Sequence, residues 1–98
     1  MDLLSKVQSV LDTQKRILDA IGITNKIHVD SGIFVLTIDK YFAKTIRKGF
    51  ANAHSTNLGT ITEIKTDGMV SFVWVENSIK MTKKEIKEYV IKKLNEEV

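Results

Sequence analysis

The residues from Ile33 to Ile38 form an almost continuous apolar run, and this run limits what the chain can fold into. Most of its side chains are β-branched or aromatic, which is typical of a strand buried on both faces. A sheet that contains such a strand has to bury its apolar surface against another layer. We therefore expect helices to cover at least one face of a sheet built around Ile33–Ile38.

Two β-hairpins are predicted. Lys26–Asp30 alternates between polar and apolar residues, and Ser31-Gly32 then provides a tight turn before the apolar run. Thr60–Thr66 and Met69–Glu76 flank Asp67-Gly68, which is the strongest short-range hairpin signal in the chain. Together the two hairpins predict a four-stranded antiparallel sheet.

Three amphipathic helices are predicted around these hairpins. The first covers residues 2–21 and ends at Gly22, which tolerates the left-handed conformation of a helix end. The second covers residues 40–53, and its expected buried stripe is Phe42, Ile46, Phe50 and Ala53. The third begins at a capping box formed by Thr82 and Glu85.

The order helix–hairpin–helix–hairpin–helix predicts one α+β domain over residues 1–98, with a four-stranded antiparallel sheet packed by helices. An SH3-like small barrel with helical additions is the alternative, because the second hairpin also resembles a hairpin of such barrels. Residues 22–27 and 59–64 are similar, and each segment precedes a turn. This period of roughly 37 residues fits either a duplicated helix–hairpin unit or a chance resemblance between hairpins.

The composition argues against most kinds of chemical site. The chain has no cysteine, so thiolate metal sites, thiol nucleophiles and disulfides are excluded. Its two histidines, His28 and His54, lack the spacing of metal ligands, and its serines lack a nucleophile-elbow context. The five glycines are isolated and form no phosphate-binding fingerprint. We therefore expect no catalytic residues, no metal and no cofactor.

The apolar segments of the sequence bear on where the protein is located in the cell and on whether it forms a dimer. No apolar run approaches the roughly 20 residues of a membrane span, and the N-terminus lacks the features of a signal peptide. These features predict a cytoplasmic protein without membrane contact. The apolar pairs of the first helix recur every seven residues, so this stripe could cover the protein's own sheet or form a homodimer.

Charge is concentrated in residues 40–54. This segment holds four of the 15 basic residues and none of the 12 acidic ones, which leaves 11 basic against 12 acidic residues elsewhere. Lys40, Lys44, Arg47 and Lys48 recur at helical spacing, so we expect them to form one basic stripe. Such a stripe can neutralise phosphates, although many lysine stripes are only solvated helix faces.

These features favour a non-enzymatic nucleic-acid-binding module. Phosphates would be contacted by the basic stripe, and secondary contacts would come from Asn52, His54 and Asn57. Tyr41 could stack on bases if exposed, whereas Phe42 and Trp74 fit core stripes better. The alternative is a protein–protein interaction module, such as a small phage-encoded inhibitor of a host protein or an assembly subunit. Pairing of Lys44 and Lys48 with internal acidic residues would contradict nucleic-acid binding.

Overall fold

The computed structural model of the chain describes residues 3–30, 32–52, 61–76 and 78–96. Along the chain its elements are α1 (Leu3–Ala20), β1 (Asn25–Asp30), β2 (Ile33–Asp39), the 3₁₀ helix η1 (Lys40–Phe42), α2 (Ala43–Asn52), β3 (Ile61–Thr66), β4 (Met69–Val75) and α3 (Lys83–Glu96). The predicted α+β class, with three helices and a four-stranded antiparallel sheet, is confirmed.

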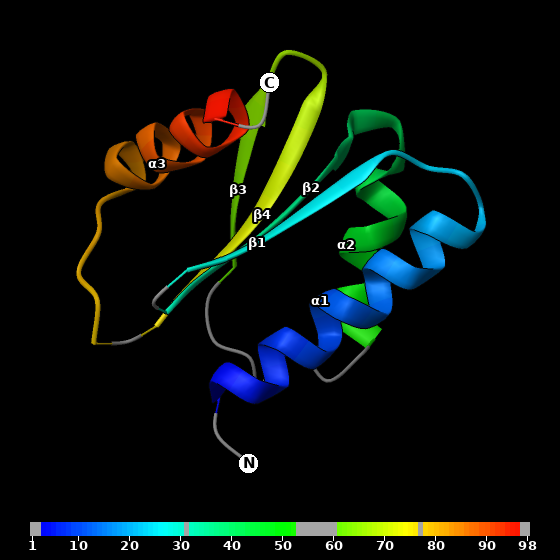
Figure 1. Ribbon diagram of the computed structural model, residues 1–98, viewed down its shortest axis with the longest axis horizontal. Coiled ribbons are helices and arrows are strands. Elements are labelled where there is room, and N and C mark those ends of the chain that lie inside the picture. Colours follow the sequence, from blue (N-terminus) through cyan, green and yellow to red (C-terminus); the bar gives the residue numbers. More distant parts are fainter. Residues whose placement is uncertain (1–2, 31, 53–60, 77, 97–98) are drawn as a thin grey trace.

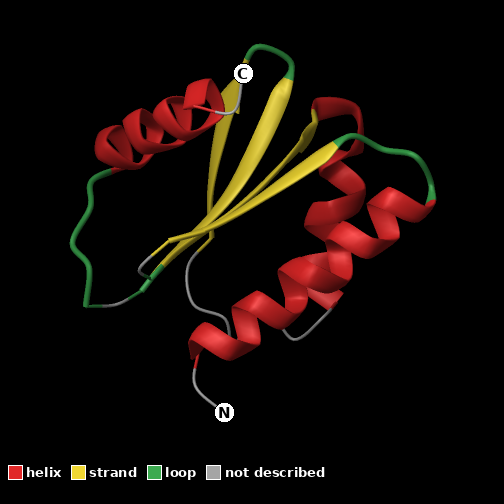
Figure 2. Cartoon of the chain, in the orientation of Figure 1, coloured by secondary structure: helices red, strands yellow, loops and turns green. Residues whose placement is uncertain are grey.

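The sheet separates two helical layers. Its strands lie in the order β1-β2-β4-β3, and every neighbouring pair is antiparallel. Figures 1 and 2 show α1 and α2 on one face of the sheet and α3 on the other. Within the described residues the outer strands β1 and β3 do not pair with each other, so the sheet is open and the small-barrel alternative is wrong.

Burial on both faces of the central strands follows from the alternation of their side chains. Every second residue faces α1 and α2, and this core contains Phe34, Leu36 and Ile38 of β2 and Val70, Phe72 and Trp74 of β4. The intervening residues Val35 and Val73 pack with Ile64, Ile86 and Val90 on the α3 side. The prediction that Ile33–Ile38 is covered on both faces is therefore confirmed.

The apolar stripe of α1 lies mainly against the sheet. Val7, Leu11 and Leu18 expose 1% of their surface or less, whereas Ile17 and Ile21 expose 49% and 64%. Next to this helix, a Cβ built at Gly49 of α2 would lie 3.4 Å from Nε2 of Gln14. This is an ordinary van der Waals distance, so α1 and α2 lie in contact at this point.

The predicted inward stripe of the second helix is wrong at Phe42, whose exposed fraction is 39%. Lys40–Phe42 form the 3₁₀ helix η1 instead of the first turn of α2. Because a 3₁₀ helix has three residues per turn and an α-helix has 3.6, the spacing counted from Ile46 does not bring Phe42 to the inner face. Of the remaining positions, Ile46 is buried, and the side chains of Phe50 and Ala53 lie outside the described residues.

The two halves of the sheet are related by an approximate two-fold axis. The strands β3 and β4 begin 36 residues after β1 and β2, at Ile61 and Met69 against Asn25 and Ile33. In the register of β2 with β4, Leu36 pairs with Phe72, which is its own counterpart 36 residues later. An axis through this pair and normal to the sheet relates β1 to β3 and β2 to β4 and keeps the faces of the sheet unchanged.

Candidate nucleic-acid interface

A groove separates η1 and α2 from the turn between β3 and β4. The carboxylate of Asp39 accepts a hydrogen bond from the backbone amide of Tyr41 at 2.9 Å, which caps the start of η1. The backbone amide of Lys40 donates to the carbonyl oxygen of Gly68 at 2.9 Å. These two bonds hold the first residues of η1 against the hairpin turn.

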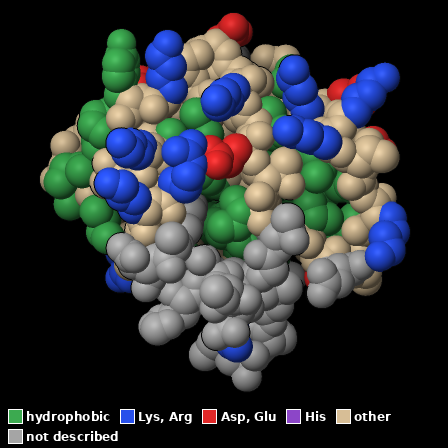
Figure 3. Space-filling model, turned by 180° about the vertical axis from the view of Figure 1, so that it is seen from behind, with side chains coloured by type: hydrophobic (Ala, Val, Ile, Leu, Met, Phe, Trp, Pro, Cys, Tyr) green, Lys and Arg blue, Asp and Glu red, His purple; other side chains and the backbone are tan. Residues whose placement is uncertain are grey.

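Basic side chains predominate in this groove, which has a volume of about 480 Å³. Its charged lining residues are Lys40, Lys44, Arg47 and Lys65, with Asp67 as the one acidic group among them. Figure 3 shows Lys and Arg side chains gathered on this side of the molecule, with an acidic side chain beside them. We refer to this feature as the basic groove.

Arg47 is neutralised within the protein. Its guanidinium donates from Nε to Oε2 of Glu63 at 2.9 Å and from Nη2 to Oε1 of the same carboxylate. The hydrogen bonds from Arg47 lower the pKa of Glu63 below its ordinary value, and those to Glu63 raise the pKa of Arg47. Arg47 therefore contributes less positive potential to the groove than the lysines do.

Tyr41 is placed at the groove with its ring in solvent. Its exposed fraction is 81%, the highest among the large hydrophobic side chains that the structure describes as exposed. The ammonium of Lys40 lies 5.8 Å from the centre of the ring. A cation at this distance interacts with the π face of the ring, so the aromatic and the basic character of the groove coincide.

The predicted site residues divide into three groups. Lys40, Lys44 and Arg47 line the basic groove, whereas Lys48 is exposed on α2 and does not line it. Asn52 ends α2, and its side chain lies outside the described residues, as do His54 and Asn57. Within the described residues the ion pair of Glu63 is with Arg47, and neither Lys44 nor Lys48 pairs with an acidic side chain.

Lys65 lines the basic groove but was not among the predicted site residues. This residue lies in β3, and the Asp67-Gly68 turn brings that end of the hairpin to the first turns of the second helix. The strong turn signal at Asp67-Gly68 located Lys65 along the hairpin, but not the helix opposite it. Trp74 was expected in the core, and its exposed fraction of 2% confirms this.

A second groove lies between α1 and the strands β1 and β2, at positions that partly match the basic groove. This α1 groove has a volume of about 800 Å³. Four lining residues of each groove are equivalent by the 36-residue offset. They are Ser5, Gln8, Val29 and Phe34 in the α1 groove and Tyr41, Lys44, Lys65 and Val70 in the basic groove.

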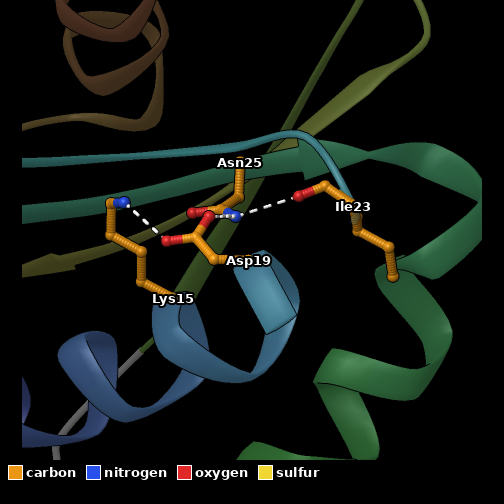
Figure 4. Close-up of polar contacts among 4 residues, drawn as sticks. All are labelled: Lys15, Asp19, Ile23 and Asn25. Atoms are coloured by element: carbon orange, nitrogen blue, oxygen red, sulfur yellow. Dashed lines mark hydrogen bonds and ion pairs between the residues drawn. The ribbon is translucent and has the colours of Figure 1, made fainter. Parts of the chain in front are cut away.

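The charges of the α1 groove are balanced. Lys15 and Arg16 line it together with Asp12 and Asp19. Asp19 accepts from Nζ of Lys15 at 2.9 Å and from Nδ2 of Asn25 at 2.9 Å, as Figure 4 shows. These bonds, chiefly that from Lys15, lower the pKa of Asp19. The same fold thus forms one balanced and one basic groove.

The described part of the chain contains no group of three or more His, Asp or Glu side chains that could hold a metal ion. None of its helices combines the length and the apolar character that a membrane span requires. Comparisons with protein-family models, curated proteins and solved structures found no match to this chain.

Proposed function

We propose that the protein is a non-enzymatic nucleic-acid-binding module and that the basic groove contacts phosphates. The observation behind this proposal is the difference between the two equivalent grooves. Gln8 and Val29 of the α1 groove are replaced by Lys44 and Lys65 in the basic groove. Lys44 and Lys65 are exposed and contribute nothing to the buried core, so a role in binding explains their presence.

The electrostatics of the groove suit a polyanion. Lys40, Lys44 and Lys65 line the same groove, and Arg47 offsets the carboxylate of Glu63. A cluster of like charges costs free energy in the unbound protein, and a phosphate backbone relieves this repulsion. Contacts with about three phosphates predict that the logarithm of the binding constant falls with the logarithm of salt concentration at a slope of about −2 to −3.

The test compares two variants with the same change in net charge. Lys44→Glu/Lys65→Glu reverses two charges in the basic groove, and Lys6→Glu/Arg16→Glu reverses two charges on exposed positions of α1. Fluorescence anisotropy with a labelled oligonucleotide, between about 50 and 200 mM salt, reports affinity and slope. We expect loss of binding in the first variant alone. Equal loss in both variants, or no binding by the unmodified protein, contradicts the proposal.

The second candidate is a protein-interaction module, and the apolar surface of α1 favours it. Ile17 and Ile21 lie one helical turn apart and are 49% and 64% exposed. Burial of these two side chains against a protein, including a second copy of the chain, would remove apolar surface from water. Light scattering of the unmodified protein and of Ile17→Ser/Ile21→Ser tests for a dimer. A monomer in both cases contradicts self-association.

A further inference from the structure

Tyr41 is the feature of the basic groove that charge alone does not explain. Phe34, Phe72 and Trp74 are buried in the core and expose 3% or less of their surface, whereas Tyr41 exposes 81%. Its neighbour Ala43 already supplies the apolar contact of this segment with the core. The Tyr41 ring therefore adds little to folding and remains available to a ligand.

Two hydrogen bonds fix the backbone that carries the Tyr41 ring. Its own amide is bonded to Asp39 at 2.9 Å, and the preceding amide, of Lys40, is bonded to the carbonyl oxygen of Gly68 at 2.9 Å. A planar side chain with two rotatable bonds on a fixed backbone loses little conformational entropy when a ligand packs on it. This is the arrangement expected of an aromatic platform.

The distribution of charge around the ring matches a nucleotide. Lys40 lies over the ring at 5.8 Å from its centre, and Lys44 and Lys65 line the same groove. A nucleotide has a flat base with a phosphate on its sugar, so one ligand unit can contact both the ring and the lysines. At about 480 Å³ the groove falls within the range of small-molecule sites, roughly 300–1,000 Å³.

An exposed aromatic ring distinguishes between the two forms of nucleic acid. In a duplex both faces of an internal base are covered by its neighbours, so no face remains for a tyrosine. In a single strand the bases can leave the stack and pack on aromatic side chains. We propose, building on the function proposed above, that the basic groove binds single-stranded nucleic acid, with a base stacked on Tyr41 and the flanking phosphates at Lys44 and Lys65.

The experiment measures anisotropy of labelled strands of about 12 nucleotides, as DNA and as RNA, alone and annealed to their complements. We expect each protein–strand affinity to exceed that of the matching duplex by at least about tenfold. Tyr41→Leu should weaken binding of the single strand by about 5- to 150-fold, which is the range for loss of one base–aromatic stack, and leave the salt slope unchanged. Tyr41→Phe keeps the ring and should retain the affinity. A higher affinity for the DNA strand or for the RNA strand shows which nucleic acid the groove prefers. Either preference supports the proposal.

Any of four outcomes overturns it. Equal affinity for strand and duplex contradicts it, and so does unchanged strand binding by Tyr41→Leu. It is also contradicted if polyglutamate competes with the labelled strand as effectively as an unlabelled strand does. That result would indicate a general polyanion site or an acidic protein partner. In the first two cases the salt-dependent loss in Lys44→Glu/Lys65→Glu still supports the function proposed above. If the unmodified protein binds no oligonucleotide, both the single-strand proposal and the nucleic-acid-binding function are contradicted. Circular dichroism of each variant verifies that the exposed substitution leaves the fold intact.

Discussion

The side-chain hydroxyls of Thr37 and Ser71 lie 2.7 Å apart between the two central strands, where neither residue exposes any surface. The two residues are also register partners of β2 and β4. Each hydroxyl therefore satisfies the other within a layer that is otherwise apolar. A polar pair of this kind ties the two helix–hairpin halves together at one register.

Removing the two hydroxyls together should cost less stability than the sum of the two separate removals. We expect Thr37→Val to lower the free energy of unfolding by about 1–3 kcal/mol, because the Ser71 hydroxyl is left buried without its partner. The double variant Thr37→Val/Ser71→Ala should be less destabilised than the sum of the single variants. Urea unfolding of all four proteins measures the coupling. Strict additivity would show that the hydroxyls do not depend on each other.

Freeing Arg47 should strengthen binding to nucleic acid. Glu63→Gln removes a negative charge beside the basic groove and the charge that neutralises Arg47. We expect affinity to rise by about two- to fivefold at low salt, an effect that higher salt suppresses. Anisotropy titrations at two salt concentrations check this. The control is Glu88→Gln on the exposed surface of α3, which changes the net charge equally and should leave affinity nearly unchanged.

The ion pair of Arg47 and Glu63 makes the free energy of unfolding depend on pH in the acid range. The pKa of Glu63 is lower in the folded state than in the unfolded chain, mainly through the hydrogen bonds from Arg47. Its contribution is therefore present above the ordinary carboxylate pKa of about 4.3 and is lost as the pH falls through the folded value. Glu63→Gln should show a shallower fall in stability on this acid limb. Urea midpoints measured from neutral to acid pH make the comparison, and parallel curves would contradict it.

The start of α3 depends on its capping box. The amide of Thr82 donates to Oε1 of Glu85 at 3.0 Å, and the amide of Glu85 donates to Oγ1 of Thr82 at 3.2 Å. We expect Thr82→Ala to destabilise the protein by about 1 kcal/mol, and Thr82→Ser to be nearly neutral because serine also caps. Thermal unfolding of the two variants separates the cap from general effects of substitution. Equal melting temperatures would contradict the role of the hydroxyl.

The hydroxyl of Tyr89 should lose its proton at a higher pH than an ordinary tyrosine does. Partial burial, together with the nearby charge of Asp30, raises its pKa to about 12, and its hydroxyl donates to Oδ2 of Asp30 at 3.2 Å. Because the folded pKa is raised, the associated stability is present below the ordinary tyrosine pKa of about 10 and is lost as the pH rises towards 12. Ultraviolet absorbance of the phenolate in Tyr41→Phe, which leaves Tyr89 as the single tyrosine, measures this midpoint. Asp30→Asn should lower it.

Local signals in the sequence determined the elements of this protein. The run Ile33–Ile38 required cover on two faces, Asp67-Gly68 required a hairpin, and Thr82 with Glu85 required a helix start; all three are observed. Each of these signals acts within a few residues, through side-chain alternation, backbone conformation or capping bonds. For the same reason the four cations of residues 40–48 were recognisable as a cluster.

How these elements pack against one another depends on the tertiary structure. The sequence left an open sheet and a small barrel as alternatives, because local pattern does not specify which strands are outermost. It placed Phe42 inside, since periodicity alone does not show where a 3₁₀ helix replaces an α-helical turn. It did not bring Lys65 to Lys44 or Glu63 to Arg47, because those approaches depend on how β3 packs beside α2. The sequence determined that residues 40–48 are basic. Long-range packing determined that Arg47 is paired with Glu63, and that Lys40 and Lys44 line a groove together with an exposed tyrosine and a lysine from another strand.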